Sequence, residues 1–192
     1  RRCHDMNTAL WIPDEFMLAV KKNQDWYLFD PSECKELHDT YGKEFSKYYR
    51  KYKKLANTGE IKNHRVINAK DLWKKILTAL YETGHPWITF KDPSNIRYSN
   101  KHEGVVHSSN LCTEILLHTS PTEYDEGSVI KVGETAVCNL ASINLASHLK
   151  VRTVDWKKLQ KTVEVAVRGL DNVINLNFYP TEEAKKANLK HR

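Results

Sequence analysis

The sequence predicts an α/β fold, because long segments with apolar residues at helical spacing alternate with short runs rich in β-branched and aromatic residues. The length of 192 residues is enough for a hydrophobic core. Hydrophobic residues make up 40% of the chain and charged residues 28%, which is typical of soluble globular proteins rather than disordered ones. We therefore expect packed helices and strands along most of the chain.

The first expected elements are two helices separated by a strand. Pro13 stands in the first turn of a helix in "IPDEFMLAVKKN", where apolar residues share one face. The segment "DWYLFDP" is aromatic-rich and predicts a short strand that Pro31 stops. A single long helix is then expected over residues 33–57, with Gly59 as its C-cap.

Within that long helix lies the most basic run of the chain, "KYYRKYKK" at 47–54. Together with the formal charge of +6 it suggests a nucleic-acid partner, since basic residues interleaved with tyrosines can form a stacking platform. On a helix, however, the apolar and aromatic residues fall on one stripe, away from most of the basic ones: Phe45, Tyr48, Tyr49, Tyr52 and Leu55. This pattern favours an amphipathic helix with a solvated basic face.

The middle of the chain predicts a helix, a strand and a loop. The helix "DLWKKILTALYETG" spans 71–84, with Asp71 as its N-cap and Gly84 at its end. The β-branched and aromatic "PWITFKD" predicts a strand. The polar, turn-rich segment "PSNIRYSNKHEGVVHSSN" then predicts a loop that delivers Cys112 at or near its end.

The last third begins with another polar segment, "HTSPTEYDEGS". The following "TAVCNLASINLASHL" is expected to start as a buried strand that carries Cys138. Apolar residues at helical spacing predict a long helix over about 155–176, and Thr181 is the expected cap of a final helix in "TEEAKKANLKHR".

The four cysteines, Cys3, Cys34, Cys112 and Cys138, are far apart and form no C-x-x-C pair. Structural zinc sites use closer ligand pairs, and secreted disulfide scaffolds use more cysteines in a shorter chain. We therefore expect no metal site in this chain and a reducing, cytoplasmic location. No apolar run approaches the roughly 20 residues that span a bilayer, and no signal peptide is recognisable.

The segment "NLCTE" places a carboxamide, a thiol and a carboxylate at every second position: Asn110, Cys112 and Glu114. If the segment is extended, these side chains share one side, because strand side chains repeat every two residues. Such a group could bind a polyhydroxylated substrate, move a proton and carry a reactive sulfur. A return strand could bring Cys138 to the same pocket as a second redox group. The alternative is that both cysteines are ordinary buried core residues.

Several blocks together resemble the large catalytic subunit of class I ribonucleoside-diphosphate reductase. They follow the order of that family and cover the chain from about Ala9 to Arg192, whereas "RRCHDMNT" matches weakly. The blocks are "ALWIPDEFM", "NQDWYLFDP", "ETGHPWITFKD", "SNLCTEI", "AVCNLASINLA" and "LDNVINLNFYPTEEAKKANLKHR".

The resemblance implies a role for each residue of the motif. Cys112 would become a transient thiyl radical that removes the hydrogen from C3′ of the substrate ribose. Glu114 would take the proton of the 3′ hydroxyl, and Asn110 would hold the sugar by hydrogen bonds. Cys138 would be one member of a redox-active pair whose partner lies upstream of this chain. The expected substrate contacts are Ser109, Asn110, Leu111, Cys112, Thr113 and Glu114.

The resemblance also implies the fold and the partners. The chain would be a partial slice of a ten-stranded α/β barrel, incomplete as a closed barrel. Residues 1–192 would form its central portion without an internal domain boundary, and the loop at about 100–125 would carry the radical cysteine. Activity would need the remaining large-subunit segments, a metal-containing small subunit that supplies the radical, and thioredoxin or glutaredoxin as reductant. ATP and dNTP effectors would act outside this chain, and no cofactor would bind it directly.

Three alternatives remain open. The chain could be an inactive interaction module that retains the ancestral fold, or a part of another thiyl-radical or glycyl-radical barrel enzyme. A nucleic-acid-binding protein would show steeply salt-dependent DNA binding. A further question concerns His107, which could act as the base of a Cys/His nucleophile or be an ordinary surface or loop histidine.

Overall fold

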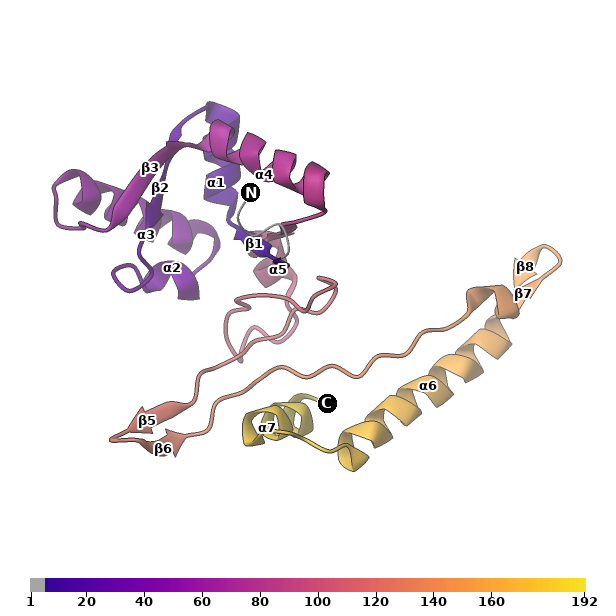
Figure 1. Cartoon of the computed structure of the whole chain (residues 1–192). Helices are drawn as coiled ribbons and strands as arrows, with labels where there is room; N and C mark the ends of the chain where they lie inside the picture. The colour runs from indigo at the N-terminus through magenta and orange to yellow at the C-terminus, as the bar shows by residue number, and fades with distance from the viewer. Residues whose placement is uncertain (1–5) are drawn as a thin grey trace. The chain divides into compact units, whose positions relative to one another are not determined.

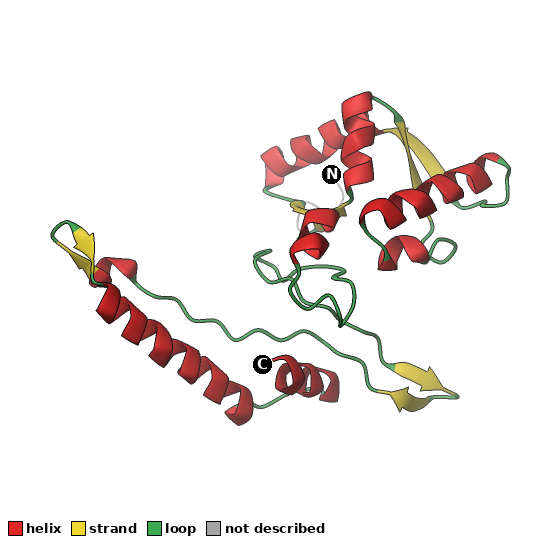
Figure 2. Ribbon diagram, turned by 180° about the vertical axis from the view of Figure 1, so that it is seen from behind, coloured by secondary structure: helices red, strands yellow, loops and turns green. Residues whose placement is uncertain are grey.

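The structure is a computed structural model that describes residues 6–192. Its contacts divide the chain into two compact units, one up to His118 and one from Thr119 onward. Figure 1 labels the helices and strands, and Figure 2 shows the same chain from behind by secondary structure. The expectation of a single domain portion over 1–192 stays a prediction, as does the proposed radical loop at about 100–125.

The first unit combines helices with two small sheets. Strands β1 and β4 pair in parallel, from Ala9 opposite Trp87 to Ile12 opposite Phe90, whereas β2 and β3 form an antiparallel ribbon. Its elements are β1 (Ala9–Ile12), α1 (Asp14–Lys22), β2 (Asp25–Phe29), α2 (Glu36–Asp39), α3 (Gly42–Asn57), β3 (His64–Asn68), α4 (Ala69–Thr83), β4 (Trp87–Phe90) and α5 (Lys91–Arg97).

An aromatic core joins α1, β2 and α3. The rings of Trp26 and Tyr49 stack with centroids 4.2 Å apart, and Phe16 meets Trp26 edge-on at 5.1 Å. The Tyr49 hydroxyl accepts a hydrogen bond of 2.8 Å from the main-chain N–H of Tyr27, so this buried ring also fixes β2. The basic residues of this run thus form a solvated face of α3, whereas Tyr49 and Tyr52 are buried and Tyr48 is partly buried, which confirms the amphipathic interpretation.

Several expected elements are confirmed. They include α1 with Pro13 at its start, the strands β2 and β4, and α4 with Gly84 in the left-handed conformation at its end. In the second unit α6 and α7 are confirmed, the latter capped by the Thr181 side chain. The cap of α4 differs, because Asn68 rather than Asp71 accepts hydrogen bonds from the first helical N–H groups.

The prediction of a single helix over 33–57 is wrong, since the segment forms two helices, α2 and α3, with an interruption between Asp39 and Gly42. Gly42 adopts a φ of +61° at the start of α3, a conformation that favours glycine. Its main-chain N–H donates to the Asp92 carboxylate, a contact from a distant part of the chain. Periodicity within residues 33–57 cannot reveal such a contact.

Helix α5 was not expected, because "PWITFKD" continues the strand pattern as far as Asp92. The helix instead starts directly after β4, with Pro93 in its first turn. Three of its polar side chains are buried and bind main-chain groups elsewhere: Lys91, Asp92 and Asn95.

The second unit contains two hairpins and two helices. Its elements are β5 (Glu123–Asp125), β6 (Ser128–Lys131), the 3-10 helix η1 (Leu145–His148), β7 (Leu149–Lys150), β8 (Thr153–Val154), α6 (Trp156–Leu176) and α7 (Glu182–His191). The Glu134 carboxylate binds Lys190 at 3.0 Å and His191 at 2.8 Å, which connects the chain after β6 to α7.

The prediction of a buried strand that carries Cys138 is wrong for this structure. Between the Ser120–Glu134 bridge and η1 the chain forms no strand, and Cys138 is exposed. A strand needs the main-chain groups of a neighbour, and the described residues provide no neighbour beside this segment. Among the described residues, no helix has the length and apolar character to cross a membrane.

We expect Tyr49→Phe to lower the free energy of unfolding by about 1–3 kcal/mol, because it leaves the Tyr27 N–H without its acceptor. Tyr48→Phe is the matched control, since its partly exposed ring lies on the same helix. Chemical denaturation of both variants would measure the difference. Equal losses in the two variants would contradict this role of the Tyr49 hydroxyl.

Burial lowers the pKa of the Lys91 ammonium from 10.5 to about 8. Between these values the unfolded chain retains a proton that the folded chain has lost, so this group makes folding more favourable as pH rises. We expect the stability of the natural chain minus that of Lys91→Met to increase from pH 8 to 10. Lys75→Met, at an exposed position of α4, should show no such change. Parallel pH profiles for Lys91→Met and the natural chain would contradict the shift.

Candidate functional site

The segment with the expected motif is a tight turn rather than an extended strand. Thr113 has a φ of +68°, and its N–H donates to the carbonyl of Asn110 at 3.1 Å. Asn110 also pairs with Ile115: its N–H donates to the Ile115 carbonyl at 3.3 Å, and its Oδ1 accepts from the Ile115 N–H at 3.0 Å. The prediction of strand-like alternation is therefore wrong here, because the Asn110 side chain closes a local loop that competes with extension.

This turn presents its reactive groups to the outside. Cys112 and Glu114 are exposed, as is the Leu111 side chain, whereas Ser109 and Thr113 are half-buried. A thiol and a carboxylate two positions apart on an exposed turn can reach one bound substrate. The structure thus brings the motif residues into one turn through local hydrogen bonds.

The chain on either side of the turn is held at its base. The Nδ1 atom of His118 lies 2.6 Å from the carbonyl oxygen of Val105, so the two ends of the loop meet. Gly104 leaves room for this ring, since a Cβ there would lie only 2.5 Å from it. The N–H of His118 also donates to the Tyr98 hydroxyl at 3.2 Å.

His107 is half-buried, and it contacts α2 rather than standing free on the surface. Its Nε2 lies 2.9 Å from the Asp39 carboxylate, and its ring stacks on His38 with centroids 4.2 Å apart. Burial lowers the pKa of His107, although the hydrogen bond with Asp39 opposes this effect. The histidine therefore ties the loop to α2, and this contact favours the loop interpretation over a base for Cys112.

The same group, His38, Asp39 and His107, places one possible metal-ligand atom from each residue within 4.8 Å. The two imidazole planes differ by only 5° and are stacked. An imidazole lone pair lies in the plane of its ring, so one ion cannot occupy both planes in this arrangement. The cluster as it stands suits stacking and hydrogen bonding better than metal coordination.

The other cysteines differ in exposure. Cys138 is exposed, and its Sγ lies 3.9 Å from the Asn139 carbonyl oxygen. Cys34 is 2% exposed and packs against Tyr52, Ala56 and Ile61, so its role is structural. Cys3 lies outside the described residues. The expected approach of Cys138 to Cys112 stays a prediction.

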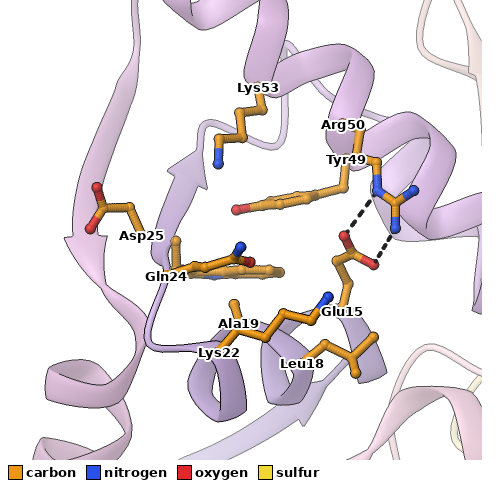
Figure 3. A pocket seen from close by; sticks show the side chains of 10 residues that line it. Glu15, Leu18, Ala19, Lys22, Gln24, Asp25, Tyr49, Arg50 and Lys53 are labelled. Carbon is orange, nitrogen blue, oxygen red and sulfur yellow. Dashed lines mark hydrogen bonds and ion pairs between the residues drawn. The ribbon is translucent and has the colours of Figure 1, made fainter.

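A cavity of about 180 Å³ lies between α1, β2 and α3 (Figure 3). The ion pair of Arg50 with Glu15, at 3.2 Å, closes one side, and Tyr49 lines it together with the buried Trp26. None of the expected site residues lines this cavity. We therefore assign it no part in the chemistry of Cys112.

Sequence reasoning missed the residues that support the turn from α5, above all Asn95. One signal was available: Pro93 follows Asp92 and stands where a first helical turn accepts proline. The polar residues around it then have helical rather than strand spacing.

Comparison with known proteins places this sequence in a family. The family described as "Ribonucleotide reductase, barrel domain" matches residues 1–192. The chain is 52% identical over its whole length to the ribonucleoside-diphosphate reductase subunit alpha of Chlamydia muridarum, of which it covers 17%. It is 40% identical to the subunit alpha of Helicobacter pylori J99 (29% covered) and 41% identical to the large chain of Cryptosporidium parvum (22% covered), again over the whole chain.

The chain thus spans about a sixth of the length of its chlamydial relative. Each of its four sheets has two strands, so the described residues form no closed barrel, as expected for a slice. The matched family and the named relatives confirm both the resemblance and the expected fold class. The chain belongs to the ribonucleotide reductase family, as part of the barrel domain of its large subunit.

Proposed function

We propose that this chain carries the radical thiol of a ribonucleoside-diphosphate reductase, which makes 2′-deoxyribonucleotides for DNA synthesis. One observation supports this most. This chain matches the ribonucleotide reductase family, and its Asn110, Cys112 and Glu114 lie together on one exposed turn. The names of the relatives supply the reaction: each is a ribonucleoside-diphosphate reductase subunit or chain.

In the proposed reaction Cys112 acts as a thiyl radical and removes the hydrogen atom from C3′ of the ribose. Glu114 accepts the proton of the 3′ hydroxyl, and the 2′ hydroxyl leaves as water. Cys112 finally returns the hydrogen atom to C3′. A pair of thiols, Cys138 and a cysteine outside this chain, supplies two electrons and two protons and ends as a disulfide; one proton leaves with the 2′ hydroxyl as water, and the other hydrogen is gained at C2′.

Asn110 has a double role in this proposal. Its Oδ1 accepts from the Ile115 N–H and keeps the turn closed, while its Nδ2 group can donate to a sugar hydroxyl without competing for the proton. Ser109, Leu111 and Thr113 would complete the substrate contacts from the same turn. The Ser109 hydroxyl donates to the Asn110 carbonyl at 3.0 Å, so its oxygen can still accept a hydrogen bond.

Other chains complete the enzyme in this proposal. The remaining large-subunit segments would close the barrel, and a metal-containing small subunit would supply the radical. Thioredoxin or glutaredoxin would reduce the disulfide, and ATP and dNTP effectors would bind outside this chain. The proposed location is the cytoplasm, with no membrane or direct nucleic-acid partner.

We expect Cys112→Ser to lower deoxyribonucleotide formation by at least about 10³-fold, and Glu114→Gln by about 10²–10⁴-fold, since they remove the radical carrier and the base. The assay combines the chain with the remaining large-subunit segments, the small subunit and a thiol reductant. Ser108→Ala, an exposed neighbour in the loop, is the control and should retain activity. Full activity of Cys112→Ser would refute the proposed function, and an inactive but folded natural assembly would favour an interaction module.

A thiol reagent should distinguish the cysteines of the described chain. At pH 8 we expect iodoacetamide to modify Cys112 and Cys138 and to spare Cys34, whose pKa burial raises from 9 to about 11. At this pH the raised pKa leaves Cys34 with about a hundredfold less thiolate than the same thiol would have at the ordinary value. Mass spectrometry of peptides would follow the three sites, and guanidinium should release the protection of Cys34. Rapid modification of Cys34 in the folded chain would contradict its structural role.

A further inference from the structure

The turn around Cys112, residues 108–115, forms no hydrogen bond with the rest of the described chain. Among the described residues, every hydrogen bond of the segment 108–115 joins two members of that segment. The place of Cys112 in the molecule therefore depends on how the chain is held immediately before and after this segment. Before the turn, His118 contacts the Val105 carbonyl, His107 contacts Asp39, and one side chain in α5 forms two hydrogen bonds with Val106.

Asn95 is that side chain in α5. Its Oδ1 accepts from the Val106 N–H at 2.8 Å, and its Nδ2 donates to the Val106 carbonyl at 3.1 Å. Nδ2 also donates to the Lys91 carbonyl within α5 at 3.0 Å. A carboxamide offers a donor and an acceptor side by side, so it can pair with both main-chain groups of one residue as a neighbouring strand would.

These bonds are made in the interior, where their loss is costly. Asn95 is 1% exposed and Val106 is 0% exposed. If the carboxamide is removed, water cannot readily replace it at the Val106 N–H and carbonyl, and the main chain must move to find other partners. Val106 lies four positions before Asn110, so such a movement would shift the turn itself.

The helix that carries Asn95 is itself fixed by its other buried polar residues. The Asp92 carboxylate accepts from the N–H of Asp14 at 2.6 Å and from the N–H of Gly42. The Lys91 ammonium donates to the carbonyls of Leu37 and His38 at 2.6 and 3.0 Å. Helix α5 thus connects α1, α2 and α3 of the first unit to the chain that enters the turn.

We propose that Asn95 is a positioning residue, which acts through Val106 to hold Cys112 and Glu114 where the substrate ribose can be reached. The inference rests on the proposed function. Asn95 touches no reacting atom in this proposal; it acts only through the chain that leads to the turn. Small displacements of reacting groups have large effects, since about 1 Å can change a rate by a hundredfold.

The first test is amide hydrogen exchange on the full chain, which does not depend on turnover. We expect Asn95→Leu, of similar size, to accelerate exchange at Val106 by at least about tenfold, with α3 and α4 unchanged. Ser94→Ala is the matched control, because its hydroxyl donates to the carbonyl of Phe90, the N-cap of α5. Unchanged exchange at Val106, or a uniform rise across the first unit, would overturn the proposal.

The second test is kinetic and uses the completed reductase assembly. We expect Asn95→Leu to lower kcat at least about tenfold, with less than about a threefold change in KM, because hydrogen-atom transfer by Cys112 depends more steeply on distance than the hydrogen bonds that hold the substrate. A natural kcat in Asn95→Leu, in an assembly that Cys112→Ser inactivates, would overturn the positioning role alone. Activity that survives Cys112→Ser would instead overturn the proposed function.

A second variant covers the case in which Asn95→Leu does not fold. In Asn95→Asp a carboxylate oxygen would face the carbonyls of Lys91 and Val106, whereas the protonated acid can donate to one of them. We expect the ratio of Val106 exchange in this variant to that of the natural chain to fall as pH is lowered from 8 to 5. A ratio near one at both pH values would overturn the proposal.

Discussion

The paired hydrogen bonds between the Asn95 carboxamide and the Val106 main chain are the constraint on which, in our proposal, the position of the turn around Cys112 depends. They join a short helix to the chain that enters the reactive turn. The neighbouring Asp92 carboxylate holds the starts of α1 and α3 from the same helix. Buried polar groups are costly unless they are paired, so these contacts specify one arrangement of several segments rather than merely adding stability.

The aromatic core supplies the stability that these polar contacts organise. Stacking of Trp26 on Tyr49 and the edge-on contact with Phe16 bury large apolar surfaces between α1, β2 and α3. Elsewhere the chain leaves apolar side chains uncovered, for example Tyr81 at 93% exposure, Leu176 and Phe178. Its sheets have only two strands each, an arrangement that is marginal by itself in water. Both features are those expected of a slice of a larger barrel domain.

Local hydrogen bonds close the turn around Cys112, whereas contacts with distant residues hold the base of its loop. Asn110 closes the turn through Ile115, a contact between residues five positions apart that a short motif can encode by itself. The base of the loop depends on Asn95, Tyr98 and Asp39, which the motif does not contain. A sequence motif can therefore name the reactive residues without revealing what holds them.

The sequence by itself determined the helices with strong apolar periodicity, α1, α4 and α6, since one face of each carries its own pattern. It also determined the family, because "SNLCTEI" and its companion blocks are read directly from residue order; the roles of the residues in that motif stay predictions. Only the tertiary structure decided the break at Gly42, the helix α5 and the exposed, unpaired state of the chain around Cys138. The turn at Thr113 is closed by local hydrogen bonds that compete with extension, which an alternation pattern does not record. The other three depend on main-chain hydrogen bonds to partners far away in the sequence, or to a neighbouring strand that the described residues do not supply, and periodicity records none of them.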